Sequence, residues 1–580
     1  MSRKLIETKF PLVEINTISE YEMSFKVYPK KATEQLKILL GVGNAKTRGL
    51  PKLNNFFFYP ARIPASATRA VTLASLVGSG VDGREFLEAL GMSNLAELVK
   101  STKKLATLYM VEPNREAVRK LLGDPEGYVV VDPMAGGGSI PLEAKRLGLT
   151  VIAGDYNPLA YLLLRASVEF PAKYGERLYR LVNEETKKLI AYVREELERY
   201  YPQGSRNAIY FLSAEHDCGG ALPLIKEAAL YKKKSIYVSW KADRERRKME
   251  FKVAGSPPPP LHACPFCGKP VSVEQLRRRW AEKHKELIDR LLQGDEKAAE
   301  EAPRLYALAA VQLTQSKYRE PTVEDELKLV EAARELAKAA REDDVAGYLP
   351  VFPIPEDNKV FEEVRKAGLN SWHYLFNPRQ LLVIYKVVKY IRQRAEVLRE
   401  AYGELGAAAA LYLALGFAKA MNYNTLLTQW HSSRGVIRDL TGSQYALNRS
   451  VELGYDFAEA VPFVNLKWAF EAEEGEEENE GETGGGLLPV LKVLAGSLGG
   501  LWREGRDAVY LWDARELDKH LPHASVDLIN VDPPYYEQHD YGGVSEFFWA
   551  VLQTVLRPVL DDLFPRERVK VDWDPYSPEI

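Results

Sequence analysis

The feature that most constrains the fold is a strand, a glycine-rich turn, a helix and a second strand in direct succession. A β-branched run at residues 129–131 leads into D-P-M-A-G-G-G-S at 132–139. A helix continues over 142–147, and a second strand covers 150–153. Two strands joined through a helix in this way run parallel. The pattern therefore predicts an α/β fold with a doubly wound sheet.

The α/β pattern returns near the C-terminus. One apolar strand covers residues 509–512 and ends at Asp513, and another covers 526–531 and ends at Asp532. Ligands of open α/β sheets bind at the carboxyl ends of the strands. We therefore expect both aspartates to lie at the same edge of the sheet as the glycine-rich turn.

The chain has 580 residues, which is too long for one core, because a typical domain has roughly 150. Helical spacing of apolar residues over 178–197, a capping box at Thr322 and Asp325, and the start Asn377-Pro378 predict a mostly helical insert. The expected parts are an N-terminal segment (1–85), a first α/β part (86–170), the insert (171–470), a flexible acidic Glu/Gly linker (471–487) and a second α/β part (488–580).

Composition excludes several classes of protein. The net charge is -3, so a nucleic-acid surface would have to be a local patch. Basic clusters at 232–234, 244–248 and 277–279 are candidates for phosphate contacts, and each is equally a solvated face. No apolar run is long enough to span a membrane, and three cysteines make no disulfide scaffold. We therefore expect a cytoplasmic protein.

The glycine-rich turn and the second strand together predict a nucleoside site. Glycines allow close backbone approach to a ligand, and Asp155 follows Gly136 by 19 positions, which suits an acid that binds ribose hydroxyls. The alternatives are a plain βα turn, or a helix cap for Asp155. The candidate cofactor residues are Asp132, Pro133, Ala135, Gly136, Gly138, Asp155, Asn157, Asp513 and Ala514.

The tetrapeptide D-P-P-Y at 532–535 is the most specific motif, because two prolines directly after a strand fix a rigid loop. It resembles the motif of amino-methyltransferases. That resemblance implies a Rossmann-like methyltransferase sheet with S-adenosylmethionine as the cofactor. It also implies that Asp532 and Pro533 accept the amino hydrogens of a flipped base, that Tyr535 stacks on the ring, and that Pro534 is structural. A rigid turn in an unrelated protein is the alternative.

Three further segments resemble adenine-specific DNA methylases that carry an inserted zinc ribbon. They are K-L-I-E through E-I-N at 4–16, F-Y-P-A-R at 58–62 and L-F-N-P-R-Q-L-L at 375–382. The resemblance extends intermittently over nearly all of the chain. It implies methylation of adenine N6 in DNA, with target recognition in the insert.

The zinc ribbon is expected at 205–285. Cys264-Pro-Phe-Cys267-Gly is one zinc knuckle, but the upstream segment keeps only Cys218 and has Glu215 where a first cysteine would fall. His216 or His262 could supply the fourth ligand. The candidate metal ligands are Cys218, Cys264, Cys267 and His216, and the alternative is a decayed ribbon that folds without metal.

The leading hypothesis is therefore a DNA adenine methyltransferase, with DNA as its partner. An RNA base N-methyltransferase and a non-catalytic nucleic-acid-binding subunit are the rival hypotheses. Only one further helix, at 541–556, is expected after the strand that ends at Asp532. We therefore expect a sheet that is incomplete at the C-terminus and a second polypeptide that completes it.

Overall fold

The structure, a computed structural model, describes residues 3–23, 30–45, 56–59, 63–259, 261–440, 451–471, 486–534 and 541–577. Three expectations fall on other residues. Tyr535, most of the acidic linker and the end of the F-Y-P-A-R segment lie outside the described part.

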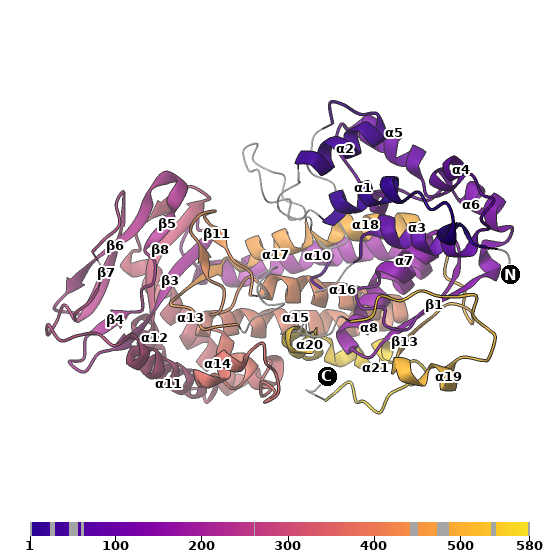
Figure 1. Cartoon of the computed structure of the whole chain (residues 1–580). Coiled ribbons are helices and arrows are strands. Elements are labelled where there is room, and N and C mark those ends of the chain that lie inside the picture. The colour runs from indigo at the N-terminus through magenta and orange to yellow at the C-terminus, as the bar shows by residue number, and fades with distance from the viewer. Residues whose placement is uncertain are drawn as a thin grey trace.

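A parallel sheet forms one end of the molecule (Figure 1). Its order is β13-β2-β1-β14, and every neighbouring pair is parallel. Numbered along the chain this is the order 3-2-1-4 of an open doubly wound sheet. The four predicted strands are confirmed, although the last is only two residues long; they are Val129–Asp132 (β1), Thr150–Asp155 (β2), Ala508–Leu511 (β13) and Leu528–Ile529 (β14).

Helices connect and cover these strands. The helix after the glycine-rich turn lies between β1 and β2, and the predicted helix at 541–556 is present. The helices of this part are α7 (Ser139–Arg146), α8 (Pro158–Leu164), a π-helical turn η5 (Arg165–Glu169), α9 (Phe170–Tyr174), α18 (Leu487–Leu498), η11 (Ala514–Glu516), α19 (Leu517–His520), α20 (Tyr541–Leu556), η12 (Arg557–Val559) and α21 (Leu560–Leu563).

The N-terminal segment and the helices that follow it up to residue 127 form a layer of short helices beside α7 (Figure 1). Arg69 fixes this layer, because its buried guanidinium binds the Glu143 carboxylate of α7 at 2.6 Å. The elements are η1 (Leu5–Glu7), α1 (Leu12–Met23), α2 (Lys30–Leu40), α3 (Ala65–Leu76), α4 (Gly83–Ala89), α5 (Met92–Thr102), η3 (Leu108–Met110), α6 (Arg115–Leu122) and η4 (Pro125–Gly127).

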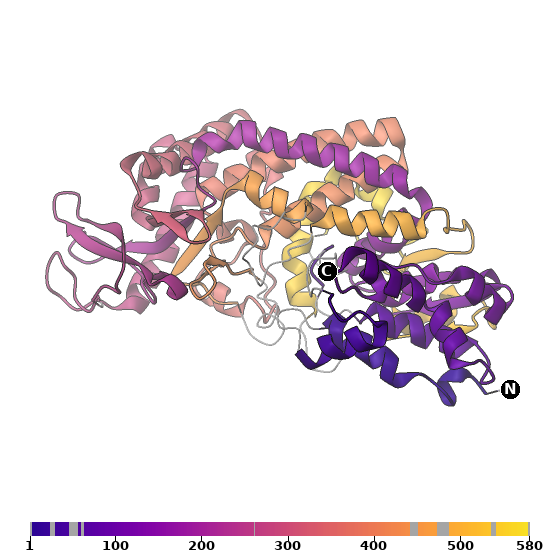
Figure 2. The same ribbon diagram turned by 90° about the horizontal axis from the view of Figure 1, so that it is seen from above.

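Long helices lead from the parallel sheet into the insert (Figures 1 and 2). The predicted starts are confirmed, since Thr322 and Asn377 each form a capping box. The helices are α10 (Glu176–Leu197), η6 (Glu198–Tyr200), α11 (Val273–Leu292), η8 (Glu296–Glu301), α12 (Ala302–Leu305), α13 (Val323–Glu342), η9 (Val345–Tyr348), α14 (Glu362–Lys366), η10 (Trp372–Leu375), α15 (Pro378–Tyr402), α16 (Glu404–Met421) and α17 (Pro462–Phe470).

The insert contains more sheet than the sequence indicated. An antiparallel sheet of order β12-β3-β8-β9, with β4 on β3, lies beside the three-stranded sheet β5-β6-β7 and the hairpin β10-β11. Tertiary pairing decides these strands, because the sequence of β8, Y-A-L-A-A-V-Q-L-T, is rich in alanine. The strands are β3 (Asn207–Glu215), β4 (Ala221–Pro223), β5 (Ala229–Tyr231), β6 (Ile236–Asp243), β7 (Lys248–Ala254), β8 (Tyr306–Thr314), β9 (Lys317–Arg319), β10 (Trp430–His431), β11 (Val436–Ile437) and β12 (Asp456–Ala460).

Helix α16 is the central core helix. By length and composition it is the one helix among the described residues that could cross a membrane, but 94% of its apolar window is buried inside the protein. Its apolar surface is therefore used for packing.

Candidate functional site

The glycine-rich turn has the geometry that its sequence predicts. Gly136 and Gly138 have φ of +50° and +85°, in the left-handed region that favours glycine. The Gly138 N–H donates to the Ala135 carbonyl at 2.8 Å, and the Ala135 N–H donates to the Gly154 carbonyl of β2 at 3.0 Å. The turn is therefore tight and held against the second strand.

Asp155 lies at the end of β2 and is bonded to this turn. One of its carboxylate oxygens accepts the Gly136 N–H at 2.8 Å, and the other accepts the Asn157 N–H at 2.9 Å. Burial raises the pKa of Asp155, and these backbone N–H groups oppose that shift. The predicted ribose acid thus sits beside the predicted glycine.

A second carboxylate, that of Asp132, interacts electrostatically both with Asp155 and with Asp532 of the D-P-P-Y motif. Asp132 ends β1 and is 2% exposed. Burial raises its pKa well above the usual range, and the negative charges of Asp155 and Asp532 raise it further. The sheet order therefore brings three carboxylates to one edge, where a cationic ligand would relieve their repulsion.

The D-P-P-Y motif lies just beyond the short strand β14. Asp532 is half-buried, while Pro533 and Pro534 are exposed. The side chain of Asn530, two residues before the motif, donates to Thr72 Oγ1 of α3 at 2.9 Å. The described part of the motif is therefore anchored to the N-terminal helical layer as well as to β1.

Asp513 and Ala514 follow β13 at the same edge, but the Asp513 side chain is already engaged. Arg515 binds its carboxylate at 2.5 Å and lowers the pKa of Asp513 to about 2. The preceding Trp512 packs inward, and its indole N–H donates to the Pro133 carbonyl at 3.1 Å. This contact ties β13 to the glycine turn.

Tyr59 is a site residue that the sequence did not single out. A Cβ placed on Gly136 would lie 2.9 Å from Tyr59 Cε1, so the tyrosine ring covers the glycine turn. Phe57 of the same segment packs edge-on against Phe548 of α20, with ring centroids 5.1 Å apart. In the sequence, the only indication of Tyr59 as a site residue was that it belongs to the aromatic segment ahead of the glycine turn.

Two asparagines hold the first turns of α20, the helix that follows the D-P-P-Y loop. Asn157 caps α8 and also donates to Ser545 Oγ at 2.9 Å. Asn358 of the insert is 3% exposed and donates to the Gly543 carbonyl at 3.0 Å. Asn157, a predicted cofactor residue, therefore uses its amide to position α20.

The predicted metal ligands come together. His216, Cys218, Cys264 and Cys267 form a group whose ligand atoms all lie within 4.8 Å of one another, and such a group could hold a metal ion. Cys218 Sγ lies 3.6 Å from Cys264 Sγ, and Cys267 Sγ lies 3.7 Å from His216 Nδ1. A Zn–S bond of about 2.3 Å places neighbouring tetrahedral ligands about 3.8 Å apart.

The fourth ligand of this group is His216. His262 and Glu215 lie outside the group, and the Glu215 carboxylate binds Arg304 at 2.7 Å. The backbone N–H of Gly220 and the His216 side chain lower the pKa of Cys218 to about 6, towards the thiolate that binds metals.

The segment at 375–382 has a structural role. Arg379 is fully buried, and its guanidinium binds the Glu459 carboxylate of β12 at 2.7 Å. The Asn377 side chain donates to the same carboxylate at 2.9 Å. The segment therefore joins α15 to the antiparallel sheet.

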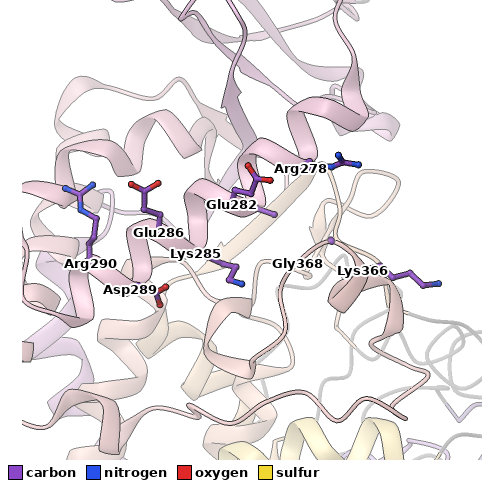
Figure 3. A pocket seen from close by; sticks show the side chains of 10 residues that line it. Arg278, Glu282, Lys285, Glu286, Asp289, Arg290, Lys366 and Gly368 are labelled. Atoms are coloured by element: carbon purple, nitrogen blue, oxygen red, sulfur yellow. The ribbon is translucent and has the colours of Figure 1, made fainter.

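A separate groove of about 650 Å³ lies along α11 (Figure 3). Its charged side chains are of both signs, so it has no clear preference for an anion or a cation. They are Arg278, Glu282, Lys285, Glu286, Asp289, Arg290 and Lys366.

Protein-family models, curated proteins and solved structures were each compared with this chain, and none of them matches it. The fold and the two groups of side chains define an α/β protein with an acidic sheet edge and a candidate metal cluster, the group of His216, Cys218, Cys264 and Cys267 that could hold a metal ion.

Proposed function

We propose that this protein is an S-adenosylmethionine-dependent methyltransferase that methylates the N6 amino group of adenine in DNA. One observation carries the proposal. The glycine turn, the acid bonded to it and the Asp532 of D-P-P-Y meet at the carboxyl edge of one parallel sheet. We also propose that the protein is cytoplasmic. This agrees with the burial of α16, the one described helix that is long and apolar enough to cross a membrane.

The residues at this edge fit the cofactor. The Asp155 oxygen that accepts the Gly136 N–H keeps a lone pair that suits a ribose hydroxyl. The Ser139 hydroxyl is 5% exposed at the start of α7 and has no hydrogen-bond partner among the described residues. The carboxylates of Asp132 and Asp532 suit a cation. When bound, the cofactor supplies an electrophilic methyl group on a sulfonium.

The chain's own residues prepare the base. Asp532 and the Pro533 carbonyl accept the two N–H groups of the target amine, which leaves its nitrogen lone pair more available for attack. Tyr535 stacks on the extruded ring, and Pro534 keeps the loop rigid. Methyl transfer would make the amine nitrogen cationic and its N–H acidic, so no strong general base is required and the Asp532 carboxylate would take up the proton.

We assign zinc to His216, Cys218, Cys264 and Cys267. The site is structural in this proposal, because all four protein ligands are present and no position is left open. Arg279 binds the neighbouring Asp217 at 2.6 Å, so the site and α11 are joined.

We also propose that a second polypeptide pairs with the outer edge of β14 and completes the sheet. No described strand pairs with that edge. Ile529 and Val531 there are 59% and 40% exposed, whereas Val131, the partner of Ile529 on β1, is fully buried. The opposite edge is covered by the chain itself, since Leu511 of β13 bridges to Val569. An exposed apolar edge favours strand addition.

Nucleoside mass spectrometry tests the proposal. The chain would be incubated with S-adenosylmethionine and either duplex DNA or tRNA, alone and together with any protein that co-purifies with it. We expect N6-methyladenine in the DNA, with higher turnover in the presence of the partner. Methylated nucleosides only in tRNA would instead support the RNA enzyme. No methylated nucleoside under any of these conditions would contradict the proposal and favour a non-catalytic subunit.

A further inference from the structure

Three turns that are far apart in the sequence meet at one end of the antiparallel lobe. They are η7 (Lys232–Lys234), the β8–β9 turn at 315–316 and the β10–β11 turn at 432–435. The Lys232 N–H donates to the Ser432 carbonyl at 3.0 Å, and the Gln315 side chain donates to the Arg434 carbonyl at 2.9 Å. One backbone and one side-chain hydrogen bond therefore fix the three turns relative to one another.

The junction is closely packed. Gly435 has φ of +67°, and a Cβ on it would lie 2.9 Å from the Gln315 carbonyl oxygen and 3.1 Å from the Tyr318 hydroxyl. The buried Gln312 side chain donates to the Gly435 carbonyl at 2.8 Å. Only glycine suits this position, and the side chains that project from the turns rest on a rigid base.

These turns and the first residue of β9 carry five basic residues, which we call the basic tip; they are Lys232, Lys233, Lys234, Lys317 and Arg434. Lys232 pairs with Glu227 at 2.5 Å. The other four have no ion pair with a described residue, and Lys233, Lys234 and Lys317 are exposed. An unpaired cluster of one sign on a rigid base is a favourable arrangement for binding an anionic polymer.

We infer that the basic tip binds the phosphate backbone of nucleic acid. The sequence offered only the lysine run at 232–234, which an ordinary solvated face would also explain. The fold adds Lys317 and Arg434 from distant segments. Nucleic acid fits better than a lipid surface, because none of the exposed large hydrophobic residues lies on the tip. The choice of DNA rests on the proposed function.

A salt titration of DNA affinity tests this inference. The variant Lys233→Gln/Lys234→Gln/Lys317→Gln is compared with the matched triple variant Lys100→Gln/Lys103→Gln/Lys104→Gln, whose lysines are also exposed and unpaired with described residues. Binding of a labelled duplex is measured by fluorescence anisotropy without cofactor. Each lost phosphate contact should reduce the slope of log K against log salt by about 0.9, so we expect a reduction of about 2–3 for the tip variant and none for the control.

Other outcomes separate the possible failures. An unchanged slope in the tip variant, or the same change in both variants, would overturn the inference. The inference would also be overturned if the tip variant bound DNA normally and lost binding only to anionic lipid vesicles. If the wild-type chain binds DNA through the tip but never methylates it, the proposed function fails and this inference stands. A further Arg434→Gln change should reduce the slope again.

Discussion

The acidic sheet edge and the candidate metal cluster are built in different ways. At the sheet edge, Asp132 and Asp155 are placed by the pairing of neighbouring strands and are bonded to backbone N–H groups. In the cluster, His216, Cys218 and Cys267 stand on loops, and their ligand atoms lie within 4.8 Å of one another. We therefore expect the sheet edge to keep its shape without a ligand, and we expect the loops of the cluster to need the zinc that we propose there.

Removing a metal ligand should have the largest effect. Structural zinc sites bind with apparent free energies of about 10–16 kcal/mol at neutral pH, so Cys264→Ser should reduce zinc from about one per chain to nearly none and lower the melting temperature. Metal analysis and thermal unfolding measure both. If the sheet edge keeps its shape independently of the cluster, the Cys264→Ser variant still binds S-adenosylmethionine.

His262 gives a matched control for the metal site. His262→Ala should keep the zinc, whereas His216→Ala should lose it, because only His216 lies within the group. Full zinc content in His216→Ala would mean that His216 is not the fourth ligand. A protein purified without metal and with an unchanged melting temperature would show that the loops need none.

A change at the sheet edge should affect chemistry and leave the fold intact. Asp532→Ala removes the acceptor that we propose for the target amine, and losing one such preorganised group costs roughly 10²–10³ in turnover. Asp518→Ala, a change at an exposed residue, is the control, and we expect this variant to keep normal turnover. Transfer of a labelled methyl group measures this. Full turnover in Asp532→Ala would show that the assigned mechanism is wrong.

Asn358 tests whether the insert positions the sheet edge. Asn358→Ala leaves the Gly543 carbonyl without this donor and should cost about 1–3 kcal/mol of stability, with turnover falling more than cofactor affinity. Asn465→Ala, which loses a comparable buried bond to the Ala420 carbonyl at 2.9 Å, is the control. Equal effects on turnover in both variants would give Asn358 only a structural role.

Local signals in the sequence predicted much of the fold. Strand ends, the caps at Thr322 and Asn377 and the knuckle at Cys264 each depend on a few adjacent residues. The antiparallel sheets of the insert were missed, because the alanine-rich β8 becomes a strand only by pairing with distant β3.

The candidate site was predictable to a similar extent. The motif residues follow their strands, and parallel pairing brought them to one edge. Two contacts could not be predicted from neighbouring residues, because they join segments that are far apart in the sequence. Tyr59 covers Gly136, and the Asn157 side chain donates to Ser545. Arg379 follows the predicted helix start at Asn377, but its buried ion pair with Glu459 is indicated by no motif.

The central claim is that the acidic sheet edge binds S-adenosylmethionine, and calorimetry tests it most directly. The wild-type chain should bind about one cofactor, and Asp155→Asn should weaken binding by about 1–3 kcal/mol, on the order of a buried charged hydrogen bond. The asparagine oxygen can accept only one of the two backbone N–H groups that Asp155 binds, so thermal unfolding of the variant is the control for an intact fold. No binding by the wild-type chain, or undiminished binding by Asp155→Asn, would contradict the account.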